Sequence, residues 1–178
     1  RRRGRSGGRW TVALKGRPGS AAGETDTGGA PEIVTADAVV IAAGVWTTLL
    51  GDMMGAHLPT IPLALTMTVT LRVPKVISHL VQHAGGRLSL KQALDGNILI
   101  GGGWPARLPV SADGQPDLDA RPELLRDSIA GNAAMAIHVL PELAGIPAIR
   151  SWVGTTTITP DQLPLVGPVP GSPGAFVV

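Results

Sequence analysis

The chain contains few side chains that could carry acid–base, nucleophilic or metal chemistry. It has no cysteine, which leaves no thiol nucleophile and no thiolate metal site. His79 and His83 have the i, i+4 spacing of one helix face. However, no glutamate stands beside the first histidine and no third ligand is near, so we expect no metal site. Asp161, in TPDQLP, is the carboxylate that stands out, either as a turn cap or as part of a site.

Three consecutive glycines, Gly101 to Gly103, follow a strand-like segment and precede Trp104 and Pro105. A phosphate cradle needs free backbone N–H groups at the start of a helix, and no helix is indicated here. We therefore interpret the glycines as a turn or bulge where the backbone passes close to another segment. Trp104 is a candidate for lining a pocket or for filling a core.

A strand, small residues and a helix follow one another between residues 38 and 55. Ala38 to Ala42 form an unbroken apolar run, typical of a strand covered on both faces of a parallel sheet, and Gly44 ends it. Val45 to Met54 have helical spacing that Gly55 closes. Open α/β sheets use this arrangement to bring backbone close to a dinucleotide, although many βα turns have small residues for packing alone.

Antiparallel strands are predicted for most of the rest. Alternation after Leu58 places Leu65, Met67, Val69 and Leu71 on one face of a half-buried strand and Thr66, Thr68 and Thr70 on the other. The other expected elements are a strand over 9–14, a loop over 16–31, a strand over 33–35, a hairpin of RLSLKQ with NILIGGG turning at Asp95-Gly96, a helix over 122–140 with Leu125, Ile129, Ala133, Ala136 and Leu140 buried, a strand over 149–157, and a final strand. The fold class is α/β with an antiparallel sheet (α+β).

Charge is concentrated at the start of the chain. Residues 1–17 carry 7 of the 15 Lys and Arg residues and no acid. A nucleic-acid-binding arm is one interpretation, but no nucleic-acid fold follows, so we expect a solvated tail and no nucleic-acid partner. No apolar run approaches a membrane span, and nothing resembles a signal peptide. We expect a cytoplasmic protein without an integral membrane segment.

Three stretches resemble the D-amino-acid oxidase family of FAD-dependent oxidoreductases. They are ADAVVIAAGVWTTLLG, RLSLKQALDGNILIGGGWPA and RSWVGTTTITPDQLPLVGPVPGSPGAFVV, and the resemblance covers about residues 10–178. The sequence of the second stretch resembles most the subunits of heteromeric bacterial dehydrogenases that act on opines, hydroxyproline or related secondary amines. The resemblance implies a basic tail over 1–8, parts of a glutathione-reductase-type FAD domain over 9–58 and 164–178, and a substrate domain with a mixed or antiparallel sheet over 59–163.

The family resemblance also implies a chemistry. A hydride passes from the carbon beside an amine nitrogen to the flavin, and water hydrolyses the resulting imine. It implies FAD near Ala43, Gly44 and Trp46, and it makes Thr156 and Asp161 the candidates near the flavin or the substrate. Trp104 is a weaker substrate candidate. The substrate would be a small amine or an amino or imino acid.

Two departures from the family pattern qualify this expectation. Glycine-oxidase-like members have at the position of Thr156 an arginine that grips the substrate carboxylate. A threonine cannot form that bidentate clamp, although Arg150 is a candidate to replace it. The G-x-G-x-x-G fingerprint and the glycine-rich closing segment are also absent. We therefore expect a fragment, cut short at both ends, that neither holds FAD tightly nor turns over alone. The alternative is a catalytically dead substrate-domain remnant that contacts partner subunits, as in a heteromeric dehydrogenase.

Overall fold

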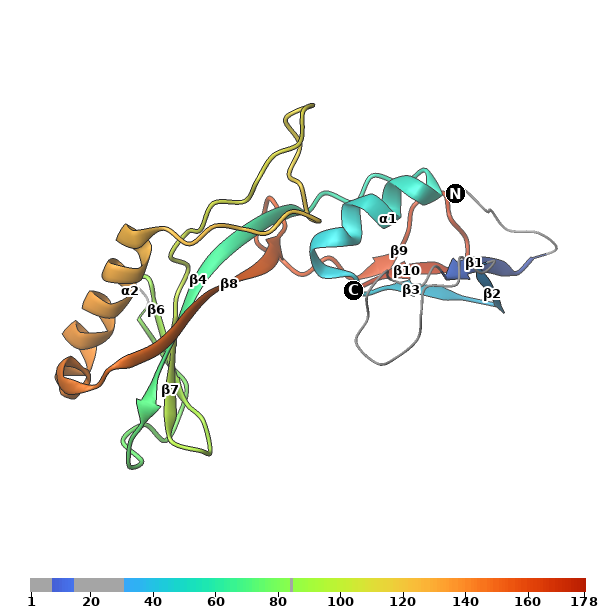
Figure 1. Cartoon of the computed structure of the whole chain (residues 1–178). Helices are drawn as coiled ribbons and strands as arrows, with labels where there is room; N and C mark the ends of the chain where they lie inside the picture. The colour runs from blue at the N-terminus through green and yellow to red at the C-terminus, as the bar shows by residue number, and fades with distance from the viewer. Residues whose placement is uncertain (1–7, 15–30, 84) are drawn as a thin grey trace. The chain divides into compact units, whose positions relative to one another are not determined.

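The computed structural model describes residues 8–14, 31–83 and 85–178, and the chain separates into two compact units (Figure 1). The first unit comprises residues 1–60 and 159–178, and the second comprises residues 61–158. The sequence-based division placed the boundaries after residues 58 and 163. The assignment of these parts to an FAD domain and a substrate domain stays a prediction. The Arg-rich start and nearly all of the predicted loop over 16–31 lie outside the described residues.

The first unit contains two small sheets. Strand β1 (Trp10–Leu14) pairs antiparallel with β2 (Glu32–Ala36), so both predicted strands are present. Strand β3 (Val39–Ile41) pairs in parallel with β10 (Ala175–Val177), which also pairs antiparallel with β9 (Gly167–Pro168). The last strand of the chain thus lies beside β3, from which it is far apart in the sequence.

A short helix follows β3 and covers one face of its sheet (Figure 1). The 3₁₀ turn η1 (Gly44–Trp46) leads into α1 (Thr47–Met54), which ends at Gly55 with a left-handed φ of 80°. The buried core of this unit consists of Trp10, Ile41, Ala56, Leu58, Val169, Ala175 and Val177. On the other face, Val40 is 59% exposed and Phe176 is 43% exposed. The expectation of a strand covered on both faces was therefore wrong for this chain.

The second unit is a five-stranded antiparallel sheet with strand order β5-β6-β7-β4-β8. The strands are β4 (Ile61–Arg72), β5 (Val81–His83), β6 (Leu88–Gln92), β7 (Asn97–Gly101) and β8 (Ala148–Ile158). The predicted hairpin is confirmed as β6 and β7, and Gly96 in its turn has a φ of +95°. The close approach expected at the triple glycine is also present, since a Cβ on Gly102 would lie 2.2 Å from the backbone N of Leu88.

Helix α2 (Arg126–Val139) lies against the sheet and is followed by the 3₁₀ turn η2 (Pro141–Gly145) (Figure 1). The helix starts later than the predicted Pro122, because Glu123 exchanges two 2.9 Å backbone hydrogen bonds with Arg107 and keeps the chain extended. The side chains it buries are those of Ser128, Asn132 and Ala136. Of the five residues predicted for the buried stripe, only Ala136 is fully buried.

The face of β4 turned toward the core consists of Ala64 and three threonines. Thr66, Thr68 and Thr70 are each at most 2% exposed, whereas the apolar residues on the opposite face are only half-buried or exposed. Burial is tolerated because each hydroxyl has a partner. Thr66 donates to the carbonyl of Pro105 at 3.2 Å, Thr68 shares a 3.0 Å hydrogen bond with Ser151, and Thr70 accepts from the N–H of Ile98 at 3.0 Å. The usual rule that the apolar face of an alternating strand is the buried one therefore fails for β4, because its threonine face is buried instead.

Candidate functional site

The three predicted cofactor residues, Ala43, Gly44 and Trp46, follow the carboxyl end of β3. Gly44 has a φ of +54°, and a Cβ placed on it would meet no atom within 4 Å. Ala43 is half-buried, and its carbonyl accepts the N–H of Trp46 at 3.1 Å, while Trp46 is 46% exposed. Small residues and an exposed aromatic ring at the end of a parallel strand leave room for a flat group to approach the backbone.

Thr156 lies on β8, exposed, on the face of the sheet away from α2. It pairs with Leu63 on β4 and shares its face with Gly154, Trp152 and Arg150. The guanidinium of Arg150 lies over the Trp152 ring, 5.9 Å from its centroid. Arg150 is six residues from Thr156, which is about 20 Å along a strand, so the two side chains of one chain cannot hold the same carboxylate.

Asp161 belongs to a tight turn in the first unit. Its carboxylate accepts the N–H of Leu163 at 3.1 Å, and the hydroxyl of Thr159 donates to the carbonyl of Leu163 at 2.7 Å. Hydrogen bonding to the Asp161 carboxylate, first from the Leu163 N–H and then from the Thr159 side chain, lowers the pKa of Asp161 from its ordinary value. The geometry matches the turn-cap interpretation, and a direct role of Asp161 in a site stays a prediction.

Trp104 packs toward helix α2. Its indole N–H donates to the carbonyl of Arg87 at 2.7 Å, and a Cβ on Gly131 of α2 would lie 2.2 Å from the outer edge of its ring. The Arg87 guanidinium lies 5.9 Å from the ring centroid. These contacts account for Trp104 as a packing residue. They also place it on the side of the sheet opposite Thr156, so the structure does not bring these two substrate candidates together.

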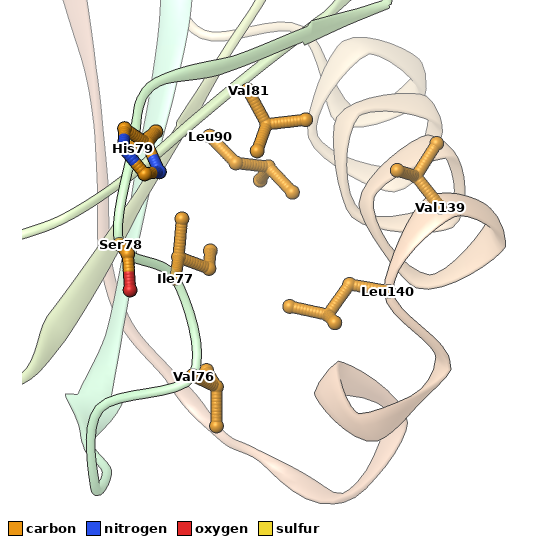
Figure 2. A pocket seen from close by; sticks show the side chains of 8 residues that line it. All are labelled: Val76, Ile77, Ser78, His79, Val81, Leu90, Val139 and Leu140. Carbon is orange, nitrogen blue, oxygen red and sulfur yellow. The ribbon is translucent and has the colours of Figure 1, made fainter.

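A cavity of about 230 Å³ lies between α2 and the segment before β5 (Figure 2). Val139 and Leu140 at the end of α2 face Ile77, Val81 and Leu90 across it, as Figure 2 shows. Val76, Ser78 and His79 complete its lining. The cavity is mostly apolar, and none of the predicted site residues borders it.

Two further features concern polar residues. The stretch with His79 and His83 is a loop followed by β5 rather than a helix. Within the residues that the structure describes, no three His, Asp or Glu side chains gather as metal ligands would.

Asn132 of α2 is fully buried and donates to the carbonyl of Gly101 at 3.2 Å, while its Oδ1 has no partner among the described residues.

The predicted site residues are divided between the two units. Ala43, Gly44, Trp46 and Asp161 belong to the first unit, and Thr156 and Trp104 belong to the second. Sequence reasoning missed the pairing of Arg150 with Trp152. Its signal is the i, i+2 spacing of a cation and an aromatic residue on a strand, which places both on one face.

The family model described as FAD dependent oxidoreductase matches residues 1–178, the whole chain. The chain belongs to the D-amino-acid oxidase-type family of FAD-dependent oxidoreductases. The chain is 31% identical to a glycine oxidase of Pseudomonas aeruginosa over 144 residues, which are 81% of the chain and 36% of that protein. It is 29% identical to the hydrogen cyanide synthase subunit HcnC of the same species, over 74% of the chain and 28% of that subunit.

Solved structures show the same fold for this family member. Glycine oxidase from Geobacillus kaustophilus superposes with a TM-score of 0.60 at 26% identity, over 94% of this chain and 41% of that one. L-proline dehydrogenase from P. horikoshii gives a TM-score of 0.69 at 21% identity, over 82% of this chain and 37% of that one. The chain therefore spans well under half the length of these relatives. No helix among the described residues is long and apolar enough to cross a membrane.

Proposed function

We propose that this chain is part of an FAD-dependent enzyme that oxidises the C–N bond of an amino acid, an imino acid or a related secondary amine. The observation that carries the proposal is the match of the FAD-dependent oxidoreductase family model over all 178 residues. Relatives point the same way, because their names are glycine oxidase, dimethylglycine dehydrogenase of Rattus norvegicus and L-proline dehydrogenase. Each name refers to an amino or imino acid, a compound whose α-carbon is bonded to the nitrogen. This is the C–N bond that the proposed reaction oxidises.

Three described residues support a contact with FAD. Ala43 and Gly44 present backbone without bulky side chains, and the exposed ring of Trp46 can pack against a flat group. We assign these three residues to cofactor contact. The flavin, when bound, supplies the hydride acceptor, and the protein positions it against the substrate.

Thr156 supports a substrate whose carboxylate is not held by an arginine at this position. Its hydroxyl forms single hydrogen bonds and carries no charge, and its neighbours on this face of the sheet include Leu63 and Gly154. Such a surface suits a secondary amine better than a small amino acid that must be clamped by its carboxylate. Trp104 and Asp161 take part only through the packing and the turn described above.

The second candidate function is a subunit-contact module without catalysis. It is favoured by the relative named as a subunit, HcnC. A heteromeric assembly would reconcile both candidates, because a site can be built from more than one chain. The predicted cytoplasmic location stays a prediction.

FAD titration of the purified chain tests the cofactor assignment. We expect a dissociation constant weaker than about 1 μM, because the chain contains no G-x-G-x-x-G sequence to hold the pyrophosphate. Ala43→Leu should weaken binding further, because Ala43 packs against the core of the first unit and a larger side chain there would displace the backbone of Ala43 and Gly44. The matched control is Ala38→Leu, at the exposed opposite end of the same strand segment.

Three results would count against this assignment. Submicromolar binding by the wild-type chain would show that the chain carries a complete site. Equal binding by Ala43→Leu and the wild type would remove Ala43 from the FAD contact. No saturable binding at any FAD concentration would favour the subunit-contact module.

A further inference from the structure

The cavity between α2 and the segment before β5 lies against the apolar core of the second unit (Figure 2). Its volume is about 230 Å³. Ile77, which is 8% exposed, and Leu90, which is 1% exposed, line it and belong to the buried core cluster of this unit. Val139 and Leu140 of α2 pack against the same cluster and form the facing wall. The cavity is therefore a space between two parts of one core, and residues 76–140 supply all of its lining.

The wall that faces α2 is held in place by one side chain, that of Gln92. Its Oε1 accepts the N–H groups of Val76 and Ile77 at 2.9 and 3.0 Å. Its Nε2 donates to the carbonyls of Pro74 and Gly96 at 3.0 and 3.1 Å. These hydrogen bonds join the irregular segment before β5 to the β6–β7 hairpin and satisfy backbone groups that no strand pairing satisfies. The wall cannot move inward to fill the cavity without losing them.

The α2 wall is also fixed by hydrogen bonds. At the end of the helix, the N–H of Leu140 donates to the carbonyl of Ala136 at 2.8 Å. In the turn that follows, the N–H of Leu143 donates to the carbonyl of Leu140 at 3.0 Å, and Leu143 is anchored in the core with 4% of its surface exposed. Because neither wall is free to collapse onto the other, the cavity is preformed, and a molecule that enters it binds at little cost in ordering the protein.

The lining selects for an uncharged apolar molecule. Six of the eight lining residues are Val, Ile or Leu, and none is Asp, Glu, Lys or Arg. Ser78 and His79 are exposed, and Figure 2 shows them farther from α2 than Ile77. An ionised group inside the cavity would therefore lose its hydration without gaining a partner.

The volume of the cavity limits the size of that molecule. An apolar cavity of about 150 Å³ in a protein core takes up one benzene molecule. A cavity of about 230 Å³ therefore has room for one ring with a short alkyl substituent. Val76 is 51% exposed, so the lining is accessible from solvent on that side and gives such a molecule a way in.

We propose that this cavity is a binding site for a small uncharged apolar molecule, about the size of an alkyl-substituted benzene ring, held between Leu90 and the end of α2. None of the residues assigned above to cofactor or substrate contact borders the cavity. The inference does not depend on the proposed function, because binding can be measured without flavin or amine.

Titration with benzene, followed by methyl NMR of the purified chain, tests the site. The methyl shifts of Leu90, Val139 and Leu140 should change and saturate together with one dissociation constant, while those of Leu94, in an exposed turn, should stay constant. Benzoate is the same ring with a charge and should bind at least about tenfold more weakly, since the lining offers its carboxylate no partner. Shifts that do not saturate up to the solubility limit of benzene overturn the proposal, as does equal affinity for benzoate.

A ring added to α2 gives a second test with a matched control. Val139→Phe places a ring in the cavity and should abolish the saturable shifts of Leu90 and Leu140. Ile137→Phe adds the same ring on the same helix at a position that is 37% exposed and does not line the cavity, so it should bind benzene as the wild type does. Val139→Leu adds only one methylene and should weaken binding several-fold while the far-UV circular dichroism stays unchanged. Binding of benzene by both Val139 variants with the affinity of the wild type would place the site elsewhere and overturn the proposal.

Discussion

A methyl group added at Gly131 tests whether the Trp104 ring is fixed against helix α2. The added Cβ would lie 2.2 Å from two atoms of the ring, and the ring is tethered by the 2.7 Å hydrogen bond from its indole N–H to the carbonyl of Arg87. Overpacking costs about 1–3 kcal/mol, a weakened hydrogen bond about 1 kcal/mol, and alanine returns about 1 kcal/mol of helix propensity. We therefore expect Gly131→Ala to lower the free energy of unfolding by about 1–3 kcal/mol.

The same substitution should have the opposite sign when the ring is absent. In a Trp104→Leu background the alanine meets no ring, so Gly131→Ala should raise the free energy of unfolding by about 1 kcal/mol through helix propensity. The four proteins of this double-mutant cycle would be unfolded in urea and followed by far-UV circular dichroism, to which the 14 residues of α2 contribute.

A sign reversal would establish Trp104 as a packing residue that is not free to line a substrate pocket. If Gly131→Ala stabilised the protein equally in both backgrounds, the ring would not lie against the helix. Trp104 would then not be held on the side of the sheet opposite Thr156.

Three further outcomes follow from the geometry. Ile98→Ala should lower the free energy of unfolding by about 2–5 kcal/mol, because Ile98 is fully buried, whereas Leu94→Ala, at an exposed turn, should change it little in the same urea experiment. Gly96→Ala should destabilise the hairpin by about 1–3 kcal/mol, since its φ is +95°, and a normal melting temperature would contradict this. The Leu163 amide shift in NMR should titrate with a midpoint below the ordinary Asp value of 3.8, because hydrogen bonds lower the pKa of Asp161. The turn is then stabilised above the unfolded-state pKa and loses that contribution as pH falls through the lower folded-state pKa, and Asp161→Asn should abolish the titration.

Local patterns predicted most of the strands. The Asp95-Gly96 turn between two short apolar runs specified the β6–β7 hairpin, since the turn needs a residue with positive φ and the strands need alternating side chains. The family resemblance likewise pointed to the small residues at Ala43 and Gly44 and to the absence of an arginine at Thr156. Both inferences depend on residues close together in the sequence.

Tertiary structure alone decided which faces are buried and which candidates share a surface. The threonines of β4 form the buried face because Pro105, Ser151 and Ile98, distant in sequence, satisfy their hydroxyls. Helix α2 starts late because Arg107 holds Glu123 in an extended pairing. Such hydrogen bonds join residues 16 to 83 positions apart, so no local pattern contains them. The composition determined that the chain has little acid–base chemistry of its own, and the packing of the sheet determined where its remaining polar groups are exposed.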